Sequence, residues 1–179
     1  MKNQKVLWIT QTAMVIALLI VLQAATAPLG NTMITGSLVN LMLVIGVMVG
    51  GLASGLTVAV LSPIFAKIFG IGPLWALIPF IALGNIALVL CWHFVGKRRF
   101  TAPVIVRGMA AMTAAVAKFL VLYVGIVQVA VPVLLQLPEK QAAMISATFS
   151  FPQLVTALIG GGLAIIVLPL LGKALKKEV

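Results

Sequence analysis

The sequence predicts an all-α integral membrane protein with six transmembrane helices and with both termini in the cytoplasm. Two observations predict the fold class, and the distribution of cations decides the number of spans. Hydrophobic residues make up 63% of the 179 residues and charged residues only 8%, whereas a soluble domain carries about 25% charged residues. The stretches 6–66, 68–96 and 141–172 contain no charged residue. Each of them is longer than the roughly 20 apolar residues that one membrane-spanning helix requires.

We expect six spans, at residues 7–27, 33–52, 54–71, 74–96, 109–136 and 152–172. No alternation of apolar and polar residues with a period of two persists along the chain, which argues against a transmembrane barrel. A segment in contact with lipid then satisfies its backbone groups only as a helix. No internal repeat is evident, so residues 1–179 are expected to form a single membrane domain.

Glycine and proline mark most of the span boundaries. Pro28 and Gly30 end the first span, and the Gly-Gly pair at 50–51 and the Ser-Gly pair at 54–55 predict a tight turn between the second and third. The Gly-Pro pair at 72–73 precedes the fourth span.

Further prolines lie at the ends of the last two spans and inside two others. Pro138 ends the fifth span and Pro152 opens the sixth. Pro63 and Pro79 fall within the third and fourth spans and predict kinked helices, whose freed backbone groups need other partners.

The cations decide between six spans and five, the alternative in which the second and third spans form one span and a re-entrant piece. The net charge is +10, with two Glu and no Asp. Six spans place nine of the 12 Lys and Arg residues on one side, namely Lys2, Lys5, Lys97, Arg98, Arg99, Arg107, Lys173, Lys176 and Lys177. Five spans would move the last three to the opposite side, against the positive-inside rule. The cation-rich side is therefore expected to be cytoplasmic, with Lys67 and Lys140 outside.

The chain lacks the residues of common catalytic and metal sites. No glycine-rich loop ends in Lys-Ser or Lys-Thr, so the chain is no ATPase, and the two Glu lie too far apart to form a carboxylate pair. His93 is the only histidine, near Cys91, whereas a zinc site needs three or four ligands. The basic residues form no long patch interleaved with aromatics. We therefore expect no enzyme, no metal, no cofactor and no nucleic-acid partner.

Uncharged hydrogen-bonding residues gather at the expected outer ends of the spans. The segment 29–40 and the segment 145–162 are rich in Asn, Gln, Ser and Thr, and Asn85 extends this set toward the middle of the fourth span. Together they predict a pocket that opens outward and is lined by amides and hydroxyls, although an interhelical hydrogen bond is the alternative role of Asn85. The expected ligand contacts are Asn31, Thr35, Asn40, Asn85, Ser150 and Gln153, with the cations Lys67 and Lys118 as further candidates.

Lys118 lies within an apolar run. At about 1.5 Å per residue from Met109, it lies roughly 13 Å deep, near the middle of a hydrocarbon core about 30 Å thick. Neither Glu falls within a span, which excludes a salt bridge inside the membrane. Two roles stay open. Lys118 braces the bundle by donating to helix carbonyls, to Asn85 or to a water, or it faces the pocket floor and contacts the ligand.

Ala13 and Ala17 in the first span form a pair of small residues at a spacing of four. Such a pair allows a second helix to approach closely. Ala is also common in membrane helices, so the pair alone does not establish an interface.

The combined pattern resembles the substrate-binding S components of energy-coupling factor (ECF) vitamin transporters. The likeness rests on the Ala13–Ala17 pair and on four stretches, "TGSLVN" at 35–40, "SPIFAKIFGIGP" at 62–73, "PFIALGN" at 79–85 and "FPQLVTALIGG" at 151–161.

The resemblance implies a multi-pass protein of a bacterial cell membrane that binds a vitamin from the exterior. The S component then docks on a membrane T component and topples to deliver the vitamin to the cytoplasm. Two separate ATPase subunits supply the energy, as in other ABC transporter complexes. Ala13 and Ala17 would contact the T component, and Lys118 would gain a third role, a contact with that subunit during toppling.

The outer polar residues favour cobalamin as the vitamin, ahead of pantothenate and then folate. A large ligand with amide edges should recruit Asn, Gln, Ser and Thr, whereas an anionic ligand should recruit Lys67 or Lys140. Two other classes remain as alternatives. A non-transport scaffold or assembly subunit of a larger complex would need no outward polar pocket, and a channel would usually assemble around a symmetric polar pore.

Overall fold

The computed structural model describes residues 2–97 and 102–175, and every regular element within them is helical. This confirms the predicted all-α fold for the described part of the chain. Six helices run the length of a bundle: α1 (Lys2–Thr26), α2 (Thr32–Gly50), α3 (Leu52–Ile68), α4 (Ile78–Phe94), α5 (Pro103–Leu122) and α7 (Phe151–Ala174). The shorter elements are the 3-10 turns η1 (Ala27–Leu29) and η2 (Trp75–Leu77), the π-helix η3 (Tyr123–Leu134), which continues α5, and α6 (Glu139–Thr148).

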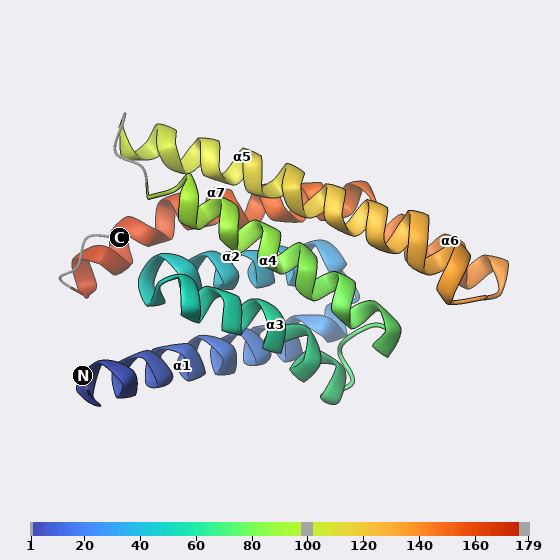
Figure 1. Cartoon of the computed structure of the whole chain (residues 1–179), viewed down its shortest axis with the longest axis horizontal. Helices are drawn as coiled ribbons and strands as arrows, with labels where there is room; N and C mark the ends of the chain where they lie inside the picture. The colour runs from blue at the N-terminus through green and yellow to red at the C-terminus, as the bar shows by residue number, and fades with distance from the viewer. Residues whose placement is uncertain (1, 98–101, 176–179) are drawn as a thin grey trace.

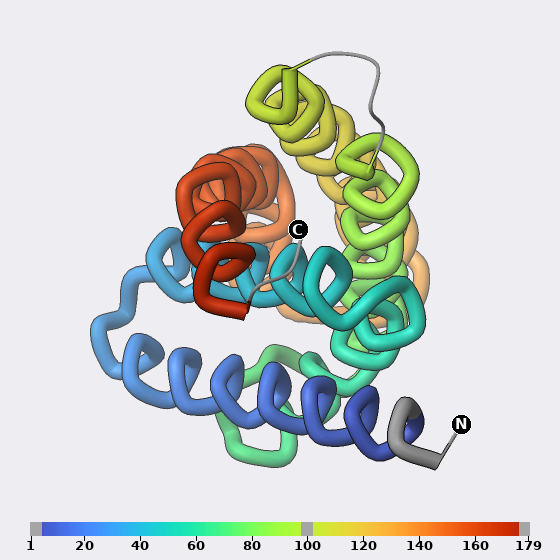
Figure 2. The backbone as a smooth tube through the Cα atoms, turned by 90° about the vertical axis from the view of Figure 1, so that its left-hand side faces the viewer, coloured from blue at the N-terminus to red at the C-terminus, as the bar shows by residue number. Residues whose placement is uncertain are grey.

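Successive long helices run in opposite directions (Figure 1). Helices α1, α3 and α5 point one way and α2, α4 and α7 the other, so that the start of α1 and the end of α7 lie at the same end of the bundle. We call the opposite end, where α1 joins α2, α3 joins α4 and α6 precedes α7, the loop end. Figure 2 looks along the bundle and shows α1 on its outer side, where it packs chiefly on α2 and α3.

Five helical segments are long and apolar enough to cross a membrane, which indicates a multi-pass membrane protein. They cover residues 5–29, 32–50, 75–94, 103–134 and 139–174. The sixth long helix, α3, has 17 residues and is about 25 Å long at about 1.5 Å per residue. It is therefore shorter than the roughly 30 Å of a typical hydrocarbon core, although it runs antiparallel to α2 and α4 through the bundle (Figure 1).

Three predicted features differ in part from the structure. The tight turn predicted between α2 and α3 is present, but Gly51 alone forms it, with a φ of +86° in the left-handed region that glycine adopts without strain. Ser54 and Gly55 lie inside α3 rather than in that turn, and Gly55 lets α3 approach Val47 of α2. Pro79 occupies the first turn of α4, where its missing N–H is not needed, so it does not kink that helix as predicted.

The third difference concerns the start of the fifth span. Helix α5 begins at Pro103 instead of residue 109. The apolar residues between Pro103 and Arg107 form its first turn, in which proline is tolerated. Lys118 consequently lies midway along the continuous helical segment 103–134.

The core of the bundle is apolar and tightly packed. Leu43 and Val47 of α2, Val89 and Trp92 of α4 and Ala115 of α5 are among its buried residues. The outward faces of the helices also carry large apolar side chains, which suits a surface in contact with lipid.

Candidate functional site

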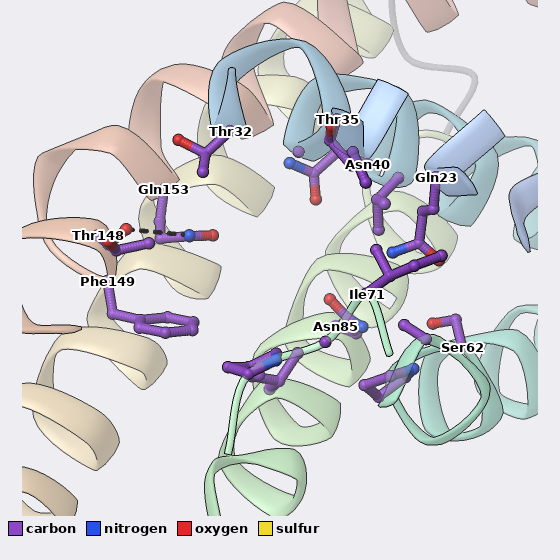
Figure 3. Close-up of a pocket in the computed structure, with 18 of the residues that line it drawn as sticks. Gln23, Thr32, Thr35, Asn40, Ser62, Ile71, Asn85, Thr148, Phe149 and Gln153 are labelled. Carbon is purple, nitrogen blue, oxygen red and sulfur yellow. Dashed lines mark hydrogen bonds between the residues drawn. The ribbon is translucent and has the colours of Figure 1, made fainter. Parts of the chain in front are cut away.

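A cavity of about 300 Å³ lies at the loop end of the bundle (Figure 3). Its wall comes from α1, α2, α3, α4 and α5, from the loop 71–73 and from the junction between α6 and α7. Asn31 and Thr32 at the start of α2 are exposed, whereas Asn40 of the same helix and Asn85 of α4 are each only 1% exposed. The cavity therefore extends from a wet mouth to a floor inside the bundle.

The structure brings six of the eight predicted ligand residues together around this cavity. They are Asn31, Thr35, Asn40, Asn85, Gln153 and Lys118. The two others do not line it. Ser150 donates its hydroxyl hydrogen to the carbonyl oxygen of Ser146 at the junction of α6 and α7, and Lys67 lies in the last turn of α3 outside the cavity wall.

The deepest polar group is a cluster of one lysine and two asparagines, which we call the Lys118 cluster. Lys118 Nζ donates to Asn40 Oδ1 at 2.6 Å and to Asn85 Oδ1 at 2.8 Å. Asn40 Nδ2 donates in turn to Thr156 Oγ1 at 3.4 Å, and Asn85 Nδ2 donates to the carbonyl oxygen of Ala59 at 3.3 Å. These bonds connect five helices, α2, α3, α4, α5 and α7, at one level of the bundle.

Close helix packing places Asn40 at this level. A Cβ atom on Gly160 of α7 would lie 2.6 Å from Asn40 Cβ and 2.7 Å from the carbonyl oxygen of Ser37. Only a glycine therefore allows α7 to approach α2 this closely. Gly162, two residues further along α7, faces open space instead.

The Lys118 ammonium has no acidic partner among the described residues. The sequence contains no Asp, Glu139 is exposed on α6, and Glu178 lies outside the described residues. Two amide oxygens thus provide the hydrogen bonds to a side chain that is only 4% exposed. Burying a charge with neutral partners alone is costly, so this arrangement needs a reason beyond packing.

Lys118 meets the geometric requirements of two of the predicted roles. It donates to Asn85, as expected for a brace within the bundle. It also lines the cavity, as expected for a residue that contacts a ligand.

Four polar residues of the cavity, Gln23, Thr32, Ser62 and Thr148, were not among the predicted contacts. Gln23 of α1 and Ser62 of α3 both line it, and Gln23 Oε1 and Ser62 Oγ are buried without a hydrogen-bond partner in the described part of the chain. A serine in a helix commonly donates to the carbonyl four residues earlier, yet Ser62 does not. The only signal in the sequence was that each of these two polar residues, Gln23 and Ser62, has apolar neighbours on both sides.

Ala13 and Ala17 do not line this cavity and are exposed on α1. A different face of α1 packs into the bundle through Thr12, Ile16 and Leu19, and Thr12 Oγ1 donates to Ser54 Oγ at 2.9 Å. The two alanines therefore take no part in packing within the described chain.

Comparison of the chain with protein-family models, with curated proteins and with solved structures found no match. The described residues also contain no group of three or more His, Cys, Asp or Glu side chains that could hold a metal ion. The site is therefore interpreted from its own geometry.

Proposed function

We propose that this chain is a substrate-binding S component of an ECF-type vitamin transporter in a bacterial cell membrane. The observation that carries the proposal is the cavity, which is lined by amides and hydroxyls and penetrates an otherwise apolar bundle as far as the Lys118 cluster. Small-molecule sites typically combine apolar walls with a few converging polar groups in this way. A scaffold subunit has no need for buried polar groups around an open cavity.

The cavity is proposed to face the exterior. Lys5, Lys97, Arg107 and Lys173 belong to the end of the bundle at which α1 starts and α7 ends (Figure 1). Among the described residues the loop end carries fewer cations, namely Lys67 in the last turn of α3 and Lys140 at the start of α6. The positive-inside rule then assigns the loop end to the outside, so both termini are cytoplasmic.

The volume of the cavity supports a compact ligand. About 300 Å³ lies at the lower limit of the roughly 300–1,000 Å³ that small-molecule sites span. Pantothenate suits this volume better than folate, and cobalamin, the vitamin that the polar residues first favoured, would require the loop end to widen. We therefore rank pantothenate-sized vitamins first.

Transport needs partners that this chain lacks. The sequence has no ATPase motif, so two ATPase subunits and a membrane T component would complete the transporter. The exposed Ala13–Ala17 face of α1 supports a close contact with such a component, because small residues allow helix backbones to approach each other.

A binding screen with a transport assay tests the proposal. The purified protein is titrated with a panel of vitamins by calorimetry, and the vitamin that binds is then followed into vesicles that also contain a T component and two ATPases. We expect one vitamin to bind and to enter in an ATP-dependent manner. The control variant Thr113→Val should bind and transport the vitamin as the wild type does, because Thr113 is exposed on α5 away from the cavity.

Two outcomes would contradict the proposal. Binding without ATP-dependent uptake would leave a binding protein that is not part of a transporter. A chain that binds no vitamin and co-purifies with an unrelated membrane complex would be a scaffold.

A further inference from the structure

We propose that the ligand of this cavity is a small carboxylic acid whose carboxylate binds Lys118 and which also carries a hydrogen-bond donor. This inference rests on the proposed function, since it specifies the substrate class of the same site.

The first argument concerns the free donor of Lys118. An ammonium group has three N–H donors, and Lys118 uses two of them for Asn40 and Asn85. Because Lys118 also lines the cavity, its third donor remains for a group inside that space.

The second argument concerns charge. The Lys118 ammonium is 4% exposed, and both of its partners are neutral amides. A carboxylate in the cavity would supply the missing counter-charge. A neutral ligand could offer the ammonium only another dipolar acceptor, like the two amides that it already has.

The third argument concerns the remaining unpaired atoms. Gln23 Oε1 accepts hydrogen bonds and cannot donate, and it is buried without a partner. An N–H or O–H group on the ligand would satisfy it. Ser62 Oγ, also unpartnered, supplies a hydroxyl that can donate to a ligand oxygen.

Figure 3 shows how these groups are arranged. Gln23 and Ser62 lie on one side of the space, Gln153 and Thr148 lie on the other, and Asn85, which binds Lys118, lies between them. Gln23 and Lys118 line the same cavity, so the proposed acid would direct its carboxylate to the ammonium and its donor to the glutamine oxygen.

Pairs of ligands, each an acid and its neutral analogue, test the role of the ligand's negative charge. The unmodified protein is used, so the result does not depend on the folding of a variant. Purified protein is titrated with pantothenate and panthenol, biotin and biotin amide, and nicotinate and nicotinamide. For the pair that fits, we expect the acid to bind at least about 30-fold more tightly than its neutral analogue, as when one partner of a buried charge pair is removed.

Two results would overturn the inference in distinguishable ways. A neutral member that binds as well as its acid refutes the carboxylate and leaves the proposed function standing. If no member of any pair binds while another vitamin of the wider panel does, the inference fails and the proposed function stands.

Variants of two buried serines test the contact at the other end. Ser62→Ala removes a hydroxyl without a partner, so we expect unchanged or higher thermal stability but about 2- to 12-fold weaker binding of the acid. Ser54→Ala removes the bond to Thr12 away from the cavity, so it should lower thermal stability and leave the affinity unchanged. Equal affinity in the wild type and in Ser62→Ala would refute the contact with Ser62.

Lys118→Met completes the experiment. In this variant we expect the acid and its neutral analogue to bind with equal affinity, because the charged partner is gone. If the acid still binds Lys118→Met more tightly than the neutral analogue does, its carboxylate binds another residue and the inference is overturned.

Discussion

Three side chains, Lys118, Asn40 and Asn85, hold the floor of the cavity together. Each asparagine oxygen accepts from the ammonium, and each asparagine nitrogen donates to another helix. Removing one member leaves buried polar atoms without partners, which costs about 1–3 kcal/mol for each atom. The three residues should therefore behave as one unit in unfolding experiments.

A double-mutant cycle measures this coupling. We expect Lys118→Met and Asn85→Leu each to lower the free energy of unfolding by about 1–3 kcal/mol, measured by reversible denaturation in mixed micelles. The double variant should lose at least about 1 kcal/mol less than the sum of the two, as contacting residues do. Strictly additive losses would show that the bond between Lys118 and Asn85 contributes nothing to stability.

The two glycines Gly160 and Gly162 offer a matched test of helix packing. Gly160→Ala would place a Cβ atom 2.6 Å from Asn40 Cβ, and such overpacking typically costs about 1–3 kcal/mol. Gly162→Ala meets no atom within 4 Å, so it should leave stability unchanged or raise it slightly, since Ala favours helix. Equal thermal stabilities of the two variants would contradict the close approach of α2 and α7.

The sequence predicted the types of residue at the site better than their contacts. Asn40, Asn85 and Lys118 stand out because polar groups inside apolar spans are unusual. The hydrogen bond between Lys118 and Asn40 joins residues that are 78 positions apart, and the sequence has no feature that pairs them. Gln23 and Ser62 were missed because a lone polar side chain in an apolar run is as often satisfied by its own helix.

At the scale of elements, α1 differs from the other long helices in its one-sided packing. Thr12, Ile16 and Leu19 contact the bundle, whereas Ala13 and Ala17 are exposed. A substitution at the two alanines should therefore leave the bundle intact and affect only what docks on α1 from outside.

The double variant Ala13→Trp with Ala17→Trp tests this docking. We expect ATP-dependent uptake to be lost and ligand affinity to remain, because bulky side chains separate helix backbones that need close approach. The control, Ala13→Ser with Ala17→Ser, keeps small side chains and should retain uptake. Normal uptake in the tryptophan variant would exclude this face as the contact with the T component.

The apolar runs of the sequence predicted the six long helices, because lipid leaves few alternatives to a helix. They did not predict several of the helix boundaries. The predicted turn involves Gly51 but not Ser54 and Gly55, and α5 begins at Pro103 rather than at residue 109. A single left-handed glycine is enough for the turn, and nothing in the sequence distinguishes Gly51 from the neighbouring Gly50. The π-helix η3 was not predicted either, because its residues are as apolar as those of an α-helix.

At the scale of the whole molecule, the six helices place the start of α1 and the end of α7 together and the cavity at the other end (Figure 1). Lys140 at the start of α6 and Lys173 in the last turn of α7 are both exposed, at opposite ends. These two positions can report which end faces the cytoplasm.

Cysteine labelling tests the orientation independently of any ligand. In a Cys91→Ala background, we expect Lys140→Cys to react with a membrane-impermeant maleimide in intact cells and Lys173→Cys to react only after permeabilisation. The reverse pattern would place the cavity on the cytoplasmic side, and labelling of both in intact cells would contradict the membrane crossing by α7 between these positions.

The most direct measurement is native mass spectrometry of the protein released from its own membrane in mild detergent. We expect wild-type protein to carry one small organic acid per chain. Thr35→Trp fills the cavity at a half-buried wall position and should abolish this added mass, whereas Thr113→Trp, exposed on α5, should keep it. Wild-type protein without bound ligand, or an equal added mass in Thr35→Trp, would contradict a ligand site in this cavity.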